Sequence, residues 1–246
     1  MKTILRAEGI SKRFGGVIAL NKVSIEVKEG EFLGIIGPNG SGKTTLFNII
    51  TGFVKPDEGR VIYMGIDITG LPPHRIARMG IARTFQIMRP LENLSVFDNL
   101  VTYALPRSRS KKEAVEKAER VLKLVGLSDK RDLLARDLNA AEKRRLELGR
   151  AIISEPKLLL LDEVLAGLSP AEIDRSLDLL GRIHSMGITI VMIEHIMRAV
   201  MRICRRIVVL NYGNIIAEGT PEEVSRDPRV IEAYLGKPIA EGFKAG

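Results

Sequence analysis

The stretch that decides the fold is Gly37-Pro38-Asn39-Gly40-Ser41-Gly42-Lys43-Thr44, which has the pattern G-x-x-x-x-G-K-T. It follows the apolar run 32–36, typical of a strand buried on both faces, and leads into helical periodicity over 44–52. Glycines let backbone N–H groups approach phosphate oxygens, and the following helix directs its positive end at the same oxygens. In this strand-and-helix context the pattern predicts a loop that binds nucleotide phosphates rather than a chance match in a turn.

Two residues at the end of the loop have expected roles of their own. Lys43 would place a positive charge at the β- and γ-phosphate oxygens, and Thr44 would place its hydroxyl on Mg²⁺. The residues expected to contact nucleotide in this region are Gly37, Pro38, Asn39, Gly40, Ser41, Gly42, Lys43, Thr44 and Thr45.

A second candidate group lies 119 residues after Lys43, where Leu158–Leu161 precede Asp162 and Glu163 (162 − 43 = 119). Four apolar residues predict a buried strand, and ligands of open α/β sheets bind at the carboxyl ends of such strands. We expect Asp162 to serve the metal, directly or through water, and Glu163 to be the general base for an attacking water. Alone, the same pair would fit an exposed helix start.

A third apolar run, 188–193, also ends in polar residues, Glu194 and His195. His195 is a candidate hydrogen-bond donor to a γ-phosphate.

Composition excludes several classes of protein. The 246 residues are 45% hydrophobic and 28% charged, which is ordinary for a globular chain with a real core. The one cysteine, Cys204, allows no intramolecular disulfide and no cysteine zinc cluster. No run is long enough to span a bilayer, and the first residues do not resemble a secretory signal, so we expect a soluble, cytosolic protein. The net charge of +8 permits a nucleic-acid or membrane-surface partner, although most of the excess fits a solvated helical face in residues 106–150.

Periodicity along the rest of the chain predicts an α/β core interrupted by a helical insert. Strands are expected over 5–9, 23–27, 61–63, 206–210 and 215–217, with turns at 57–59 and 211–214. Residues 94–154 show helical spacing and little strand signal. Capping boxes at Ser169/Glu172 and Thr220/Glu223 predict two helix starts, the first helix running to about Ser185.

Taken in order, these motifs resemble the ATP-binding subunits of ABC transporters over nearly the whole chain. The resemblance is carried by the phosphate loop, Gln86, Leu158–Glu163, Ala166–Leu168 and His195. Five further short segments are similar to those of the branched-chain amino-acid importer ATPases, namely Thr84–Gln86, Asn93–Val96, Asn99–Leu100, Glu194–His195 and Val209–Gly213.

The resemblance implies a RecA-like P-loop NTPase core with an antiparallel β subdomain, over residues 1–86 and 155–246, and an inserted helical subdomain over 87–154. It also implies that Phe14 stacks on adenine, although a core Phe at a strand end fits equally well. Gln86 would contact Mg²⁺ and the attacking water, and would link the nucleotide site to the helical subdomain. Without the resemblance, the sequence favours an ordinary exposed residue at a strand end for Gln86.

One segment departs from the family pattern. Where the family has Leu-Ser-Gly-Gly-Gln, this chain has Leu138-Asn139-Ala140-Ala141-Glu142. In the family this signature contacts the γ-phosphate of ATP held by the opposite subunit, which assigns Asn139 and Ala141 to nucleotide contact. Asn139 and Glu142 equally fit an ordinary helix cap. Ser169 also stands where the family usually has Asp.

The resemblance thus implies an ATPase using ATP and Mg²⁺, peripheral at the cytoplasmic face of the membrane. Its implied partners are integral membrane permease subunits, a second ATPase subunit in a heterodimer or homodimer, and indirectly a periplasmic or extracellular solute-binding protein. The expected solute is a branched-chain or other hydrophobic amino acid. No nucleic acid is expected, although an ABC ATPase acting on nucleic acid or ribosomes, or a regulatory subunit that only binds nucleotide, stays an alternative. The apolar residues of 86–99, including Met88 and Leu91, are expected to supply part of the helical core and a groove for a permease helix.

Overall fold

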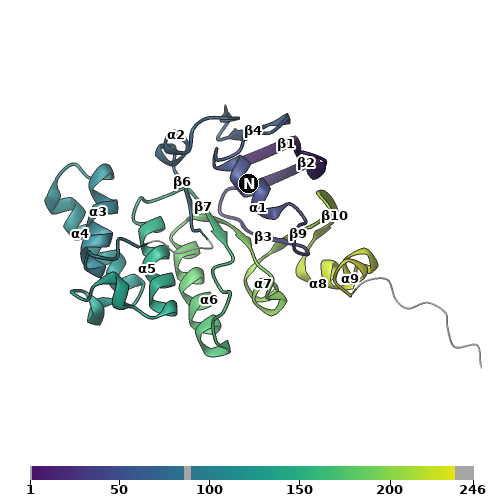
Figure 1. Cartoon of the computed structure of the whole chain (residues 1–246). Coiled ribbons are helices and arrows are strands. Elements are labelled where there is room, and N and C mark those ends of the chain that lie inside the picture. The colour runs from purple at the N-terminus through teal and green to yellow at the C-terminus, as the bar shows by residue number, and fades with distance from the viewer. Residues whose placement is uncertain (1, 86–89, 236–246) are drawn as a thin grey trace, which may run out of the picture. The chain divides into compact units, whose positions relative to one another are not determined.

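The computed structural model describes residues 2–85 and 90–235 of the chain (Figure 1). By its internal contacts the chain divides into two compact units, residues 1–72 with 193–246, and residues 73–192. Among the described residues, no helix is both long and apolar enough to cross a membrane. Two residues singled out in the sequence, Gln86 and Met88, lie outside the described part of the chain.

The first unit combines an antiparallel sheet with strands that flank the phosphate loop. Its strands are β1 (Thr3–Phe14), β2 (Val17–Lys28), β3 (Phe32–Ile36), β4 (Glu58–Tyr63), β5 (Ile66–Asp67), β9 (Arg206–Asn211) and β10 (Asn214–Gly219). Its helices are α1 (Lys43–Ile50), α7 (Met197–Ile203), α8 (Pro221–Arg226) and α9 (Pro228–Leu235). The antiparallel sheet has the order β2-β1-β4-β5, while β3 pairs in parallel with β9 and β9 in antiparallel with β10.

The burial of these strands follows their sequence patterns. Every residue of β3 is buried, as its continuous apolar run predicts. In β2 the buried positions Val23, Ile25 and Val27 alternate with exposed ones, as expected for a strand with one covered face. The β9–β10 hairpin turns at Tyr212 and Gly213, whose φ angles of 43° and 74° match the mirror-image turns that suit hairpins.

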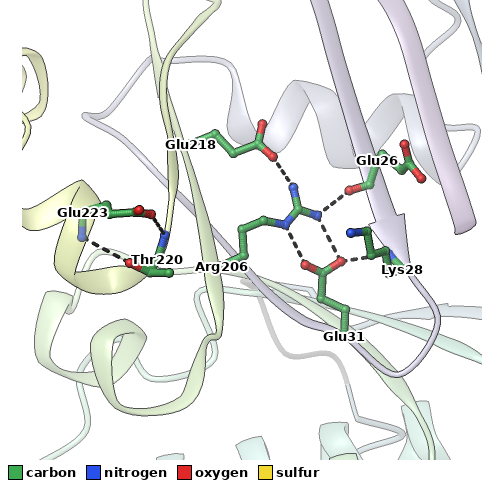
Figure 2. Close-up of polar contacts among 7 residues, drawn as sticks. All are labelled: Glu26, Lys28, Glu31, Arg206, Glu218, Thr220 and Glu223. Atoms are coloured by element: carbon green, nitrogen blue, oxygen red, sulfur yellow. Dashed lines mark hydrogen bonds and ion pairs between the residues drawn. The ribbon is translucent and has the colours of Figure 1, made fainter. Parts of the chain in front are cut away.

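Arg206 joins several strands of the first unit at one point (Figure 2). Its guanidinium binds both carboxylate oxygens of Glu31, at 2.7 and 3.0 Å, and donates to the backbone carbonyl of Glu26 in β2 at 2.5 Å. It also pairs with Glu218 of β10. The hydrogen bond to Glu31 is the main cause of the raised pKa of Arg206. The start of β9 is therefore fixed to the ends of β2 and β10 by one planar side chain.

The second unit holds helices together with three neighbouring strands. The strands are β6 (Ile81–Arg83), β7 (Leu158–Asp162) and β8 (Thr189–Ile193, whose last residue belongs to the first unit), in the order β8-β7-β6. The helices are α2 (Pro73–Arg78), α3 (Val96–Ala104), α4 (Lys111–Leu124), α5 (Ala140–Ile152) and α6 (Pro170–Ser185), with 3₁₀ turns η1 (Leu105–Arg107), η2 (Ser128–Lys130) and η3 (Ala135–Asp137).

The helical part of this unit has its own core. Helix α3 packs against α4 and α5, and the three lie together in Figure 1. The expectation that part of 86–99 enters this core is confirmed for Val96 and Phe97, which are buried. Both predicted capping boxes are present, at the starts of α6 and α8, and the Thr220–Glu223 pair is drawn in Figure 2.

One local prediction was wrong. Residues 57–59 were expected to form a turn, but Glu58 and Gly59 belong to β4. Glu58 pairs with Ser11 across a register shift in β1, and Gly59 has a φ of 87°. A Cβ at Gly59 would lie 2.4 Å from the carbonyl oxygen of Glu8. The glycine thus lets the backbone of β4 come close to β1 where the pairing is irregular. In the sequence, an Asp-Glu-Gly stretch at such a site cannot be told from a turn.

Candidate functional site

The phosphate loop of the first unit contains three glycines in backbone conformations that other residues seldom adopt. Gly37, Gly40 and Gly42 have φ angles of 150°, 78° and 105°. A Cβ at Gly37 would lie 2.0 Å from the carbonyl oxygen of Leu210, and one at Gly42 would lie 2.4 Å from that of Ala19. Both conformation and space therefore require glycine at the two ends of the loop.

The loop is also supported from outside. The backbone N–H of Gly213, in the β9–β10 turn, donates to the carbonyl of Ser41 at 3.0 Å, and the carbonyl of Gly213 accepts from Asn21 of β2 at 2.9 Å. The loop backbone is thus held in place before any ligand contact is considered, which lowers the entropy cost of binding.

Lys43 lies inside this loop. Its ammonium group donates to the carbonyls of Gly37 and Pro38, both at 2.9 Å, and to the Ser41 hydroxyl at 3.3 Å. Although it is charged, only 5% of Lys43 is exposed. A buried cation surrounded by loop backbone is the arrangement that phosphate oxygens require.

Helix α1 begins at Lys43, directly after the loop. Its N-cap, Gly42, supplies no side-chain cap, and no acidic residue lies in its first turn. The N–H groups of the first turn have no partner within the helix, so the helix start offers donors and a positive dipole end. Thr44, the candidate metal ligand of the loop, is exposed, and Thr45 is half-buried.

The acidic pair of the second unit follows a fully buried strand, as predicted. Leu158–Leu161 are inaccessible to solvent, and Asp162 ends β7 with 3% of its surface exposed. The alternative of an exposed acid pair at a helix start is therefore wrong for Asp162. Glu163 is half-buried and has a φ of 51°, a left-handed conformation that a glutamate seldom adopts.

The Asp162 carboxylate has a partner that the sequence did not suggest. Arg83, the last residue of β6, donates from Nη2 to Oδ2 of Asp162 at 2.7 Å. Thr84 accepts the Asp162 backbone N–H on its hydroxyl at 3.2 Å. Arg83 belongs to no motif singled out in the sequence, and a lone arginine in a short strand gives no signal of its partner.

His195 and Phe14 both belong to the first unit. His195 is half-buried after β8, and its backbone N–H donates to Oε2 of Glu194 at 3.3 Å. Phe14 ends β1 with 50% of its surface exposed, and the Lys12 ammonium lies 5.5 Å from its ring centroid. The core alternative for Phe14 is therefore wrong, and its exposed ring is free to stack on a planar ligand.

The segment at Asn139 forms a complete capping box. Oδ1 of Asn139 accepts the Glu142 backbone N–H at 2.9 Å, and Oε2 of Glu142 accepts the Asn139 N–H at 3.0 Å. The helix-cap interpretation is thus confirmed. Asn139 and Ala140 are exposed and Ala141 is half-buried, so the helix start is also accessible.

The predicted residues are distributed between the units. The loop 37–45, Phe14 and His195 lie in the first unit, and Asp162, Glu163, Asn139 and Ala141 lie in the second. Their roles in binding and catalysis stay predictions.

Comparison with known proteins identifies the class to which this site belongs. The family model described as ABC transporter matches residues 20–166, and that described as branched-chain amino acid ATP-binding cassette transporter matches residues 214–240. The chain belongs to the ABC transporter family. The resemblance and the α/β fold with its P-loop core and antiparallel sheet are thereby confirmed.

Individual relatives are similar to this chain over nearly its whole length. The high-affinity branched-chain amino acid transport ATP-binding protein LivG of Salmonella typhimurium is 40% identical, over 95% of this chain and 98% of its own length. The high-affinity branched-chain amino acid transport ATP-binding protein BraF of Pseudomonas aeruginosa is also 40% identical, over 96% of this chain and 99% of its own length. A crystal structure of MJ1267, an ATP-binding cassette of an ABC transporter, superposes with a TM-score of 0.89 at 38% identity, covering 96% of this chain and all of that one.

Proposed function

We propose that this chain is the ATP-hydrolysing subunit of an importer that takes up branched-chain amino acids through separate membrane subunits. The observation that carries the proposal is the buried Lys43 ammonium inside a glycine loop, in a chain similar over 95% of its length to a transport ATP-binding protein. The loop N–H groups, Lys43 and the start of α1 bind the phosphates of ATP. The exposed Phe14 ring stacks on adenine.

The residues fit Mg²⁺ as the metal. Mg²⁺ is usually bound by one or two protein oxygens together with substrate phosphates and water. Thr44 offers an exposed hydroxyl and Asp162 a carboxylate, while the described residues contain no group of three or more His, Cys, Asp or Glu side chains placed to hold a metal. Thr44 and Asp162, with Gln86 as the resemblance implies, would hold an ion that arrives with the nucleotide. When bound, Mg²⁺ offsets negative charge on the phosphates.

Hydrolysis then depends on three side chains. Glu163 accepts a proton from the water that attacks the γ-phosphorus, as the bond from that phosphorus to the β–γ bridging oxygen breaks and ADP leaves. His195 donates a hydrogen bond to a γ-phosphate oxygen. Gln86 orients the water.

The proposed assembly is a dimer with permease subunits. Asn139 and Ala141 face the ATP of the partner ATPase subunit, and part of 90–99 receives a permease helix. A solute-binding protein acts on the permeases from the other side, the ATPase lies peripherally on the cytoplasmic face, and no nucleic acid takes part.

Paired substitutions test the catalytic assignment. Glu163→Gln should leave ATP binding intact, lower hydrolysis by about 10²–10⁴ and trap an ATP-bound dimer, since it removes only the base. Lys43→Ala should weaken ATP binding itself by about 10–150-fold, because it removes a charge-assisted contact. Glu116→Gln, on an exposed position of α4, is the control and should change neither. Unchanged turnover in Glu163→Gln would place the base elsewhere.

Transport is tested by purification from membranes. The full chain should co-purify with integral membrane proteins. Vesicles containing that complex, with the solute-binding protein added outside and ATP inside, should accumulate radiolabelled leucine. Failure of the complex to take up leucine, isoleucine or valine would overturn the assigned solute class.

A further inference from the structure

The ion pair between Arg83 and Asp162 lies in the interior of the second unit. The two side chains are 6% and 3% exposed, and Nη2 and Oδ2 are 2.7 Å apart. One oxygen of the candidate metal carboxylate is thus bound by a permanent cation of the same chain. Burial makes this pair electrostatically stronger than a surface ion pair, because little water screens it.

The backbone fixes both members of the pair. Strands β6 and β7 lie side by side (Figure 1). They pair in parallel, with Arg83 opposite Leu160. The Thr84 N–H donates to the Leu160 carbonyl at 3.0 Å, and the Thr84 hydroxyl accepts the Asp162 N–H. The Phe85 ring centroid lies 5.1 Å from the Arg83 guanidinium carbon. Arg83 is therefore held beside the carboxylate by its neighbours on both sides.

This arrangement changes what Asp162 presents to a metal ion. A buried carboxylate without a partner carries a full uncompensated charge, which a divalent cation would relieve. With Arg83 in place, the pair is neutral overall and Oδ2 is already hydrogen-bonded. Free Mg²⁺ also pays a large cost to lose its water, which a neutral pair does not offset. Nucleotide phosphates supply the negative charge that the pair lacks.

We propose that Arg83 prevents Asp162 from binding free Mg²⁺, so that this carboxylate accepts the metal only together with ATP. The inference rests on the proposed function of Asp162 as the metal-side carboxylate. Arg83 is then a specificity-determining residue: it selects the metal–nucleotide complex over the metal ion through its ion pair with Asp162.

Thermal unfolding with metal alone tests the proposal. The full chain, without nucleotide, should show no rise in Tm with Mg²⁺ or Mn²⁺ at millimolar concentration. Arg83→Gln keeps an N–H donor for Oδ2 but removes the charge, and its Tm should rise by about 3–6 °C at metal concentrations about ten times Kd. Electron paramagnetic resonance should then show bound Mn²⁺ in this variant and free Mn²⁺ in the wild type.

Matched variants separate charge from structure. Arg83→Lys keeps the charge and should stay unresponsive to metal. Arg60→Gln breaks an exposed ion pair with Glu8, also at 2.7 Å, and should not gain a response. The double variant Arg83→Gln with Asp162→Asn should lose the response, because the carboxylate that binds metal is gone.

Two results would contradict the proposed function of Arg83. A Tm rise of the wild type with Mg²⁺ alone, or no metal response in folded Arg83→Gln, overturns the proposal for Arg83. The wild-type measurement tests the proposal even if the Arg83→Gln variant does not fold. The function of Asp162 is judged separately: if Asp162→Asn binds the Mn²⁺–ATP complex as tightly as the wild type, with an unchanged resonance spectrum, Asp162 is not the metal-side residue.

Discussion

Arg144 of α5 donates from Nη1 to the backbone carbonyls of Glu163 and Val164, at 3.2 and 2.8 Å. The helix that begins at the signature segment thereby holds the backbone of the proposed catalytic base. Glu163 has a φ of 51°, so its backbone conformation is one that its surroundings must maintain. Arg144 is a positioning residue in this arrangement, since it acts on Glu163 only through the backbone.

Arg144→Ala should therefore lower ATP hydrolysis by about 10–100-fold while leaving the Kd for ATP unchanged, because a small displacement of a catalytic group is costly. Hydrolysis and nucleotide binding are measured on the same preparation. Lys143→Ala, which removes an exposed hydrogen bond to the Arg136 carbonyl, is the control and should keep full activity. Arg144→Lys should recover part of the loss. An equal loss in both alanine variants would indicate damage to α5 rather than displacement of Glu163.

Cys204, the one cysteine of the chain, should make the free energy of unfolding depend on pH, and its reaction with a thiol reagent should measure unfolding. Burial, and then the negative charge of Glu194, raise the pKa of this thiol to about 12. The folded state thus keeps its proton where the unfolded thiol, with a pKa near 8.5, loses it. The unfolded state binds fewer protons above pH 8.5, so stability falls as pH rises from there towards 12.

At pH 10 this linkage should cost about 2 kcal/mol relative to pH 7.5, at 1.36 kcal/mol per pH unit. Denaturant unfolding at both pH values measures it, and Cys204→Ala should lack this part of the pH dependence. A thiol reagent at pH 8 should label the native chain only at the rate of unfolding. Rapid labelling of native protein would show that the thiol is accessible.

The local elements of this fold were predictable because their causes are local. The glycine loop, the buried strands around it and the capping boxes at Ser169 and Thr220 each depend on residues close together in sequence. The candidate residues for phosphate binding and for the acidic pair were proposed for the same reason, because their motifs are short stretches of sequence. The strand pairing at Glu58 and Gly59 was missed, because it depends on Ser11 in another strand.

The contacts that set the properties of the site were not predictable in this way. Arg83 and Asp162 are 79 residues apart, and Arg144 lies 19 residues before Glu163. Arginine is common in exposed positions, and nothing in either local sequence distinguishes a buried, paired guanidinium from a solvated one. Only the parallel register of β6 and β7, and the path of α5, bring these side chains to the acidic pair.

Leu91 should be part of the permease-docking surface. Its side chain is 38% exposed, while its backbone N–H and carbonyl both bind the side chain of Asn99, at 2.9 and 3.0 Å. Because Asn99 is fully buried and binds the Leu91 backbone, we expect the loop to keep its conformation without the Leu91 side chain. Leu91→Asp should leave the intrinsic ATPase rate and Tm nearly unchanged but abolish transport by the reconstituted complex.

The control for Leu91→Asp is Leu105→Asp, at a similarly exposed leucine in η1 outside the docking segment, which should keep transport. Unfolding of Leu91→Asp would show that Leu91 belongs to the core, and normal transport would show that the docking surface lies elsewhere.

The signature segment should impair the ATP site of whichever subunit lies opposite. The backbone N–H groups of Asn139 and Glu142 are both used in the capping box, and Ala140 and Ala141 add Cβ atoms where the family has glycine. Each lost hydrogen bond to phosphate costs about 1.5–3 kcal/mol. This chain keeps Lys43, Thr44 and Glu163, which are useful only if a partner supplies a good signature. We therefore expect a heterodimer with a second ATPase subunit, and poor hydrolysis by the isolated chain.

Changing Asn139→Ser, Ala140→Gly and Ala141→Gly together should raise the ATPase rate of the isolated chain, although glycine costs a helix about 1 kcal/mol per residue. Ala171→Gly, in the capping-box turn of α6, measures that helix cost without touching the signature and should not raise the rate. Steady-state hydrolysis at saturating ATP is compared for the three proteins. A wild-type turnover of about 1–10 s⁻¹ on its own, an ordinary enzyme rate, would mean that Asn-Ala-Ala-Glu already works as a signature and that no second kind of subunit is needed.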